Sequence, residues 1–362
     1  MSKYKDYINM FMMTQSPGLN WYRVVQFSDH LNKIGVKSNY WPDHKPDENL
    51  LPNWEAAMLG NKDLMITAES QLITADTIVY QRVSSAVGFA FILGIRDRYP
   101  QKKIFCEIDD NAFDIDASNP AVKTVRPDSD PEYWFKKQLG IVDGVITSTE
   151  GLRKLYKPFN KKIHIIKNSI DFKYWDQFKK KKTPNKKIQI AWQGAWHHED
   201  DLSILAGVIP KVLKKHKNVE FHLFGHQPDY LKDITTYHPM VPITKYAKMM
   251  VKANPDIILA PLVDTKFNRC KSNLRVLEAG AMRTAVIASG NKHLPYYNTI
   301  QDLDTGLLVN KTDEWVDAIG KLIENKELRE KLGDNLYKMV KKNYNIKDTA
   351  KKYKEILTGV KT

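Results

Sequence analysis

Cysteine is scarce in this chain of 362 residues, and long apolar runs are missing. The two cysteines, Cys106 and Cys270, show no metal-ligand spacing and are too few for the disulfide framework of a small secreted protein. No apolar run reaches the roughly 18–20 residues needed to cross a bilayer, and the N-terminus lacks the pattern of a secretory signal. We therefore expect a protein of the reducing cytoplasm without a transmembrane segment.

Positive charge is concentrated in the second half of the chain. The net charge is +14; residues 1–170 carry 22 Lys and Arg against 20 Asp and Glu, whereas residues 171–362 carry 34 against 22. A surface of this sign attracts polyanions such as nucleic acid, anionic lipid or acidic polysaccharide. Lysine-rich solvated helices and an exposed linker explain the excess equally well, so charge alone does not identify a partner.

Apolar and amphipathic segments alternate in the pattern of a parallel, doubly wound α/β sheet. The expected strands cover residues 7–13, 77–81, 103–108, 144–147, 163–166, 188–192, 220–224, 257–260, 285–289 and 306–309. The expected helices cover residues 20–34, 88–98, 131–139, 201–215, 244–253, 273–282, 314–342 and 347–357. The length allows two globular domains, each with its own core.

A polar segment that contains Pro184 marks the expected domain boundary. We predict a Rossmann-like domain at residues 1–170, a linker at 171–187, a second Rossmann-like domain at 188–342, and a C-terminal helix at 343–362 that packs back toward the first domain. Ligands of open parallel sheets bind at the carboxyl ends of the strands. We therefore expect the two domains to face each other across a ligand-binding cleft.

The segment after the expected strand 257–260 has the features of a phosphate site. It contains Lys271 and Ser272 and leads into the expected helix 273–282. Free N–H groups and the dipole at a helix start attract phosphate. Glu278, about two turns into that helix, can accept hydrogen bonds from the vicinal hydroxyls of a ribose. The alternative is an ordinary strand-to-helix junction with a surface lysine and an incidental glutamate.

Carboxylates also follow an expected strand in the first half. Asp109 and Asp110 come directly after residues 103–108. Either carboxylate could orient or deprotonate an acceptor hydroxyl, and helix capping or loop ordering is an equal alternative for Asp110. Arg23 and Arg82 are further candidates to face the cleft, although each fits a structural ion pair equally well.

Short motifs occur in a fixed order along nearly the whole chain. They are residues 17–23, 76–82, 105–110, 143–149 and 165–171, followed by Gly194, His198 and the pair Asp201 and Leu202. This series resembles the nucleotide-sugar glycosyltransferases with two Rossmann-like domains, called GT-B, and most closely glycosyltransferase family 4. The resemblance implies an acceptor-binding first domain and a donor-binding second domain.

The resemblance also implies roles for individual residues. The donor-binding set is Gly18, Gly194, His198, Asn268, Lys271, Ser272, Asn273 and Glu278. The acceptor-binding set is Arg23, Arg82, Asp109 and Asp110, and the catalytic set is Asp109, Asp110, His198 and Lys271. A lone histidine is more often structural than functional, but its place between Gly194 and Asp201 favours a site for His198.

The chain departs from the family pattern at one position of the donor site. Many members carry two glutamates eight positions apart; Glu278 matches the second, but Cys270 stands at the first. The usual Arg/Lys pair after the first strand of the donor domain is also not evident between Trp192 and Asp201. Lys271 would then be the principal cation for the diphosphate of the donor, which we expect to be a UDP-sugar. We expect retention at the anomeric carbon and no metal or other cofactor.

Three hypotheses remain open for the acceptor. The first is a viral DNA-modifying enzyme in the cytoplasm of its host, transferring a sugar to a hydroxymethyl pyrimidine that is flipped out of the duplex. The second is a cytoplasmic enzyme of surface polysaccharide or teichoic-type polymer synthesis, whose basic surface meets anionic lipid. The third is a binding module for nucleotide sugars or nucleic acid that has lost turnover. DNA is the favoured acceptor; the oligomeric state is not predicted.

Overall fold

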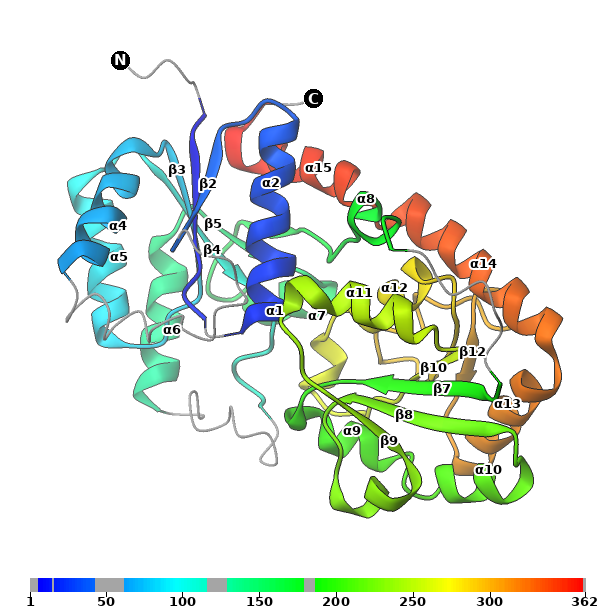
Figure 1. The fold of residues 1–362 in the computed structure, drawn as a ribbon. Helices are drawn as coiled ribbons and strands as arrows, with labels where there is room; N and C mark the ends of the chain where they lie inside the picture. The colour runs from blue at the N-terminus through cyan, green and yellow to red at the C-terminus, as the bar shows by residue number, and fades with distance from the viewer. Residues whose placement is uncertain (1–5, 15, 43–61, 116–128, 179–185, 361–362) are drawn as a thin grey trace. The chain divides into compact units, whose positions relative to one another are not determined.

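The computed structural model describes residues 6–14, 16–42, 62–115, 129–178 and 186–360. Within these ranges the chain forms two compact units. The first contains the described residues up to 168 together with the segment from Ile346 onward, and the second contains the described residues from Ser169 to Asn345. Each unit has one six-stranded sheet in which all strand pairs are parallel (Figure 1). The prediction of two Rossmann-like units is confirmed.

The sheet of the first unit has the strand order β2-β1-β3-β4-β5-β6. Its strands are β1 (Ile8–Phe11), β2 (Ser38–Trp41), β3 (Thr77–Gln81), β4 (Lys103–Ile108), β5 (Gly144–Thr147) and β6 (Ile163–Ile165). The strands β1, β3 and β5 are buried along their whole length. Helices cover both faces of a sheet of this kind, which explains why these strands read as continuous apolar runs.

Helices lie on both faces of this sheet (Figure 1). They are α1 (Pro17–Asn20), the π-helical turn η1 (Trp21–Val25), α2 (Gln26–Lys33), α4 (Lys62–Thr74), α5 (Ala86–Arg98), α6 (Asp130–Ile141), α7 (Glu150–Tyr156) and α15 (Ile346–Thr358). The last of these packs against α2, and the rings of Phe27 and Tyr353 meet edge to face at 4.9 Å. The final helix is therefore part of the first core, although it follows the second unit in sequence.

The sheet of the second unit has the order β12-β11-β10-β7-β8-β9. Its strands are β7 (Ile188–Gln193), β8 (Val219–Gly225), β9 (Thr236–Pro239), β10 (Ile257–Ala260), β11 (Ala285–Ser289) and β12 (Leu307–Val309). The central strand β10 lies between β7 and β11, and all four of its residues are buried. Its carboxyl end therefore opens near the middle of the sheet edge, where ligands of such folds bind.

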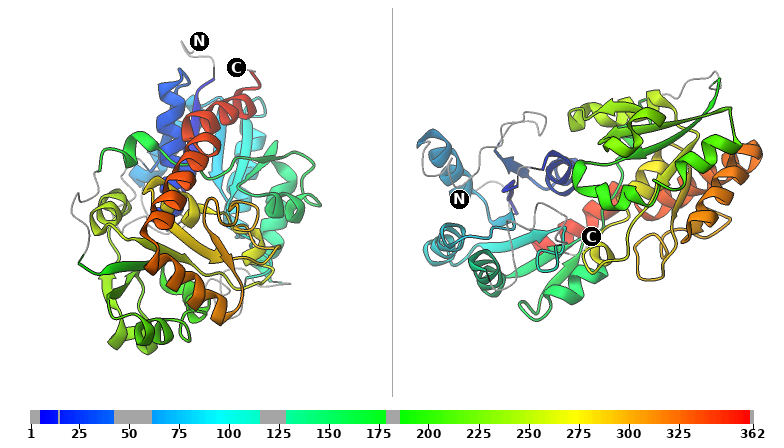
Figure 2. Two further views of the ribbon diagram at one scale, coloured as in Figure 1. Left: turned by 90° about the vertical axis from the view of Figure 1, so that its right-hand side faces the viewer. Right: turned by 90° about the horizontal axis from the view of Figure 1, so that it is seen from below.

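Two sets of helices cover this second sheet, as the two views in Figure 2 also show. They are α8 (Phe172–Trp175), α9 (Glu199–Ser203), α10 (Ile209–Lys215), α11 (Ile243–Ala253), α12 (Leu274–Ala281), α13 (Thr312–Glu324) and α14 (Lys326–Asn343), with the 3-10 turns η3 (Trp196–His198), η4 (Asp229–Ile234) and η5 (Asn268–Cys270). The helix α12 packs tightly on α14. A Cβ at Gly280 would lie only 2.6 Å from the side chain of Val340, so this close approach requires glycine. No helix in the described part of the chain is long and apolar enough to cross a membrane.

All ten expected strands are present, with bounds within two residues of the prediction. Two expected helices are each divided in the structure. The helix expected at 201–215 is interrupted between α9 and α10, where Pro210 starts a new first turn. The helix expected at 314–342 ends before Asn325, whose side chain caps α14 by accepting a hydrogen bond from the Leu328 N–H.

Elements outside the expected ranges include the short edge strands β2 and β9, and the helices α4, α7 and α8. Edge strands of four residues pair on only one side and carry polar residues, so they lack the apolar run that identifies a central strand. The helix α4 has a weak apolar periodicity, because Ile66 and Ile73 are exposed while Ala68 and Leu72 are buried.

A histidine pair joins β9 to β8 at the edge of the second sheet. Nδ1 of His222 lies 3.0 Å from Nε2 of His238, and the ring of His238 stacks on Phe224 at 4.3 Å with an angle of 9°. Burial lowers the pKa of both histidines, and the charge of His238 lowers the pKa of His222 further. The neutral rings therefore hold this edge together.

Acidification should weaken this edge. The folded histidines have lower pKa values than the unfolded ones, so between these values the unfolded chain binds more protons and acid favours unfolding. We predict that the melting temperature falls as the pH is lowered through about 6.5, the ordinary histidine value, and that His238→Phe flattens this fall because phenylalanine keeps the stack without ionising. Thermal unfolding monitored by circular dichroism tests this, with the exposed His293→Phe as control. An unchanged acid slope in His238→Phe would contradict it.

Candidate functional site

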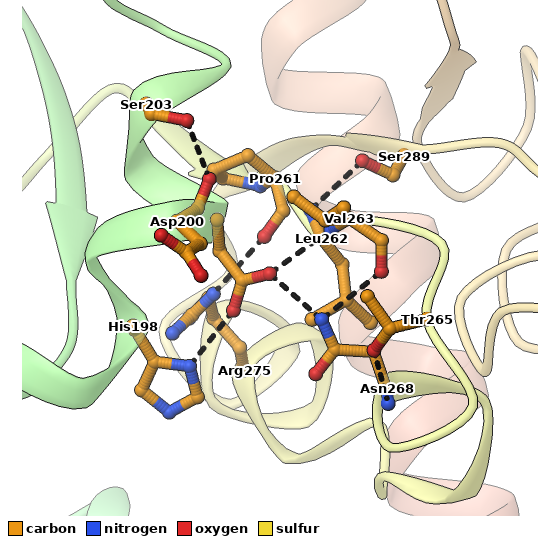
Figure 3. A network of polar contacts seen from close by, with 11 residues as sticks. His198, Asp200, Ser203, Pro261, Leu262, Val263, Thr265, Asn268, Arg275 and Ser289 are labelled. Carbon is orange, nitrogen blue, oxygen red and sulfur yellow. Dashed lines mark hydrogen bonds and ion pairs between the residues drawn. The ribbon is translucent and has the colours of Figure 1, made fainter. Parts of the chain in front are cut away.

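The candidate site lies at the carboxyl ends of β7 and β10 in the second unit. The loop after β7 leads through η3 into α9, and the loop after β10 leads through η5 into α12. Side chains from these loops form one polar network, which Figure 3 shows from close by. Parallel strands bring their carboxyl ends to one edge of the sheet, so residues about seventy positions apart meet there.

The carboxylate of Asp201 is the centre of this network. Its Oδ1 accepts hydrogen bonds from the Val263 N–H and from Nδ2 of Asn268, both at 2.9 Å. Its Oδ2 lies 2.9 Å from Nδ1 of His198. Burial raises the pKa of Asp201, while the Val263 hydrogen bond and the charges of Arg275 and Lys271 lower it. One buried carboxylate thus joins the loop after β7 to the loop after β10.

The contact with Asp201 fixes the orientation of His198. Its Nδ1 lies 2.9 Å from Oδ2 of Asp201, and this contact holds the ring in one orientation. His198 lies at the end of η3, directly before α9, and its side chain is 18% exposed. A partly exposed imidazole with one nitrogen anchored can hydrogen-bond a ligand with the other.

Asn268 and Ser289 order the loop after β10. Besides its bond to Asp201, Nδ2 of Asn268 donates to the Val263 carbonyl at 3.0 Å, and its backbone N–H donates to the hydroxyl of Thr265 at 3.1 Å. The Leu262 N–H donates to the Ser289 hydroxyl at 2.8 Å. Asn268 is buried, so in this structure it acts on the shape of the loop.

The predicted cation lies directly before α12. Nζ of Lys271 is 4.5 Å from the centre of the Phe267 ring, a cation–π contact that keeps the ammonium group in the loop. Lys271 and Ser272 are both half-buried. Cys270, in the place of the usual glutamate, is buried and forms no disulfide.

Two further predicted residues lie on and beside α12. Glu278 is buried, and its Oε2 accepts a hydrogen bond of 3.0 Å from the Tyr246 hydroxyl on α11. Nδ2 of Asn273, the residue before α12, donates to the Thr299 hydroxyl at 2.9 Å. The contact of Asn273 with Thr299 orders the neighbouring loop.

Arg275 is a residue of this site that the sequence analysis missed. Its Nη1 donates to the Pro261 carbonyl at 3.4 Å, and its guanidinium lies 5.5 Å from the centre of the Trp192 ring. A Cβ at Gly194 would lie 3.1 Å from Nη2 of Arg275. Arg275 precedes Glu278 by three positions on one helix, and this helical spacing was the signal available in the sequence.

Tyr296 connects Arg275 electrostatically to the rest of the site. Burial raises the pKa of its hydroxyl, Arg275 lowers it, and the carboxylates of Asp201 and Glu278 raise it. His198 and Asn268 contact Asp201 directly, Lys271 and Arg275 act on Asp201 electrostatically, and Glu278 acts on Tyr296. No group of three or more His, Cys, Asp and Glu side chains within the described ranges is placed to hold a metal ion.

A separate polar cluster lies at the carboxyl end of β4 in the first unit. The guanidinium of Arg23 is fully buried and lies 2.7 Å from Oε1 of Glu107. Nη1 of Arg23 also donates to the Ile166 carbonyl at 2.7 Å and to Oδ1 of Asn168 at 2.9 Å. Burial opposes the charge on Arg23, but the carboxylates of Glu107 and Asp109 raise its pKa. Arg23 therefore organises this cluster from inside the fold.

The two predicted acceptor-side carboxylates lie beside this cluster. Oδ2 of Asp109 accepts from Nδ2 of Asn168 at 3.3 Å, and burial raises the pKa of Asp109. Asp109 and Asp110 are both half-buried. The Tyr156 hydroxyl donates to the Asp110 carbonyl at 2.6 Å and so holds the backbone of Asp110 in place.

The remaining predicted residues have fewer contacts. Arg82 is half-buried, and its Nη1 donates to the Ser84 hydroxyl at 3.2 Å. Gly18 lies in α1, where a Cβ would meet no atom within 4 Å. Asn168 thus connects Arg23 to Asp109. Gly18 lies in the first unit, where no neighbouring atom requires a glycine.

The fold and the site define the class of protein. Residues 187–325, most of the second unit, match the family model described as Glycosyl transferases group 1. The match includes Gly194, His198, Lys271 and Glu278, and it confirms the predicted enzyme class, a glycosyltransferase. No curated protein matches the chain in sequence.

Several solved structures share the fold of the chain. Sucrose-phosphate synthase from Thermosynechococcus elongatus is 14% identical, with a TM-score of 0.67 over 97% of this chain and 98% of that chain. HepE of Anabaena, in complex with UDP and glucose, is 11% identical, with a TM-score of 0.61 over 98% and 99%. S. aureus TarM, in complex with fondaparinux, α-GlcNAc-glycerol and UDP, is 16% identical, with a TM-score of 0.56 over 78% of this chain and 55% of TarM. At these identities the likeness establishes the fold.

Removing the carboxylate of Asp201 should loosen the donor-side loops. Asp201→Ala leaves Asn268 and the Val263 N–H without their shared acceptor, and each buried donor left unpaired costs about 1–3 kcal/mol. We predict that urea denaturation shows a free energy of unfolding lower by at least about 2 kcal/mol. The neighbouring Asp200→Ala is the matched control, because Asp200 is exposed on the same helix. Equal stability of the two variants would contradict this role of Asp201.

Breaking the buried ion pair between Arg23 and Glu107 should lower the free energy of unfolding more than Asp201→Ala does. Arg23→Met leaves Glu107 buried without its cation, and losses of this kind are about 3–5 kcal/mol. We predict a loss of that size in urea denaturation and partial recovery in the double variant Arg23→Met with Glu107→Leu, because both charges are then absent. A double variant less stable than Arg23→Met would show that the pair is not the source of the effect.

Proposed function

We propose that the chain transfers a sugar from a nucleotide sugar, with UDP as the preferred nucleotide, to a hydroxyl group of an acceptor. The observation that carries this proposal is the polar network around Asp201, which gathers His198, Lys271 and Glu278 at the carboxyl ends of β7 and β10 within the region that matches the glycosyltransferase family model. The complexes of Anabaena HepE with UDP and glucose, and of TarM with UDP, support the choice of donor.

The chemistry requires stabilisation of the leaving group. The bond between the anomeric carbon and the diphosphate breaks as positive charge builds on the sugar, and the diphosphate gains negative charge. A cation and preorganised N–H groups at the start of α12 can stabilise that charge. In this proposal Lys271 and Ser272 contact the diphosphate, Glu278 accepts from the ribose hydroxyls, and His198 hydrogen-bonds the sugar or a phosphate through Nε2.

The proposed reaction retains the configuration at the anomeric carbon and needs no metal. The acceptor oxygen attacks the face that the diphosphate leaves, and the departing phosphate oxygen takes the acceptor proton. No separate protein nucleophile is then required. On the acceptor side, we assign to Asp109 and Asp110 the orientation of the acceptor hydroxyl, with Arg82 beside them and Arg23 supporting the cluster from within. We assign Gly18, in the first turn of α1, to the donor-binding set.

We propose a hydroxymethyl pyrimidine in DNA as the acceptor, because the net charge of +14 attracts a polyanion, although the half with the proposed acceptor-side residues carries only +2. A surface polymer of polysaccharide or teichoic type is the second candidate. The complex of TarM with α-GlcNAc-glycerol favours it, since that neighbour binds a sugar linked to a small polyol.

Substitution of the two donor-side residues tests the enzymatic proposal. We predict that Lys271→Ala and Glu278→Ala each lower turnover of a UDP-sugar by at least about tenfold, since a hydrogen bond to a charged group contributes about 1.5–3 kcal/mol. The exposed Lys292→Ala is the control for loss of positive charge. Release of UDP from a panel of UDP-sugars measures turnover. If no nucleotide sugar is consumed and Lys271→Ala leaves nucleotide affinity unchanged, the chain is a binding module or has another function.

A second experiment separates the acceptors. The protein is incubated with each donor and with hydroxymethylated duplex DNA, the same duplex without the modification, or a glycerol-phosphate polymer. A mass increase of the hydroxymethyl nucleoside alone is the expected result. Transfer to the polymer, with no change in either DNA, would overturn the DNA proposal while leaving the glycosyltransferase proposal intact.

A further inference from the structure

We propose that Arg275 is the anchored cation for the donor diphosphate, so that Lys271 is one of two cations in the site. This inference rests on the proposed function of the same site and adds a residue that neither the family resemblance nor the sequence motifs assigned. Four observations support it: the contacts of the guanidinium, its charge balance, the glycine beside it, and its place in the fold.

The guanidinium of Arg275 is held in position from two sides. The Trp192 ring lies 5.5 Å below it, and the Pro261 carbonyl accepts from Nη1 at 3.4 Å. Figure 3 shows the guanidinium next to His198, between the loop after β7 and the loop after β10. Cation–π and carbonyl contacts fix an arginine without neutralising it. The group is therefore preorganised, which is the condition for stabilising charge that develops during a reaction.

The charge of Arg275 has no direct counter-ion among the residues that the structure describes. Six other described arginines form ion pairs with carboxylates: Arg23, Arg96, Arg98, Arg153, Arg269 and Arg283. The carboxylate of Asp201, whose pKa the charge of Arg275 lowers, already accepts from Val263 and Asn268 and contacts His198. A half-buried guanidinium without an ion pair fits an anionic ligand better than a purely structural role.

The backbone at Gly194 lies too close to Trp192 and Arg275 to carry a side chain. A Cβ there would lie 2.5 Å from the Trp192 ring and 3.1 Å from Nη2 of Arg275. Any larger residue would displace either the ring or the guanidinium. The close approach of this backbone therefore fixes the position of Arg275 as well as the turn after β7.

The place of Arg275 defines the class of ligand. It lies on the first turn of α12, three positions before Glu278, and so shares a helix face with the proposed ribose contact. A guanidinium binds phosphate oxygens through two parallel N–H groups, whereas an ammonium acts as a point charge. We infer that Arg275 binds the diphosphate in a fixed orientation, and that Lys271 adds charge from the loop before the helix.

The test compares ligands that differ only in phosphate. Affinities of the full chain for uridine, UMP and UDP are measured by isothermal titration calorimetry. We expect Arg275→Gln to weaken UDP binding by about 10- to 100-fold, the effect of losing charged hydrogen bonds, while uridine affinity stays within about twofold. Arg269→Gln is the matched control, because Arg269 lies in the preceding turn and is paired with Asp264.

Two more variants keep the inference falsifiable. Arg275→Lys retains the charge but not the fork, and we expect it to recover only part of the UDP affinity. Gly194→Ala should reproduce the loss of UDP affinity with Arg275 still present. Thermal unfolding establishes that each variant is folded; if Arg275→Gln does not fold, Arg275→Lys and Gly194→Ala carry the test.

The failure of this inference differs from the failure of the proposed function. If the wild-type chain binds no uridine nucleotide, the proposed function fails. If the wild type binds UDP and the Arg275 and Gly194 variants bind UDP as tightly as the wild type, Arg275 is structural and the inference is overturned. Equal losses for uridine and UDP would likewise overturn it, because they indicate a general distortion of the site.

Discussion

The buried carboxylate of Asp201 is the interaction on which the donor-side site depends. It accepts from a backbone N–H, an asparagine and a histidine that belong to two different loops, and it is surrounded by positive charge from Arg275 and Lys271. Burial raises the pKa of Asp201, while the hydrogen-bond donors and positive charges around it lower that pKa. A single buried carboxyl group therefore connects the loop after β7 to the loop after β10 and holds the proposed phosphate site in shape.

The first unit also has a buried charged group at a strand end, but there the group is a cation. At the carboxyl end of β4 the buried charge is a guanidinium, and Arg23 holds Glu107, Asn168 and the Ile166 carbonyl in one arrangement. In both units a buried charge with several hydrogen bonds replaces apolar packing at the strand ends, where a rigid polar surface is needed. This arrangement is costly unless every partner is present, which makes these two residues sensitive points of the chain.

The α/β architecture was predictable because central parallel strands are buried on both faces and read as apolar runs between turn signals. The strands β3, β4, β5, β10 and β11 have the expected bounds. The edge strands β2 and β9 were not predictable in this way, since a short strand paired on one side needs little apolar sequence. The divisions at Pro210 and Asn325 depend on local capping that a helical period does not show.

Along one chain, spacing identifies residues that share an element, such as Arg275 and Glu278 on α12. The sequence alone therefore determined the alternating architecture and the loop with a lysine before a helix, because both are local patterns. Only the tertiary structure decided that Asp201 meets Asn268 across 67 positions and that Arg23 lies inside the fold. It also decided that Arg275 lies beside Trp192 and Gly194 without an ion pair among the described residues. Hydrogen bonds and charge balance depend on distances in space, and these exist only after the strands have aligned their carboxyl ends.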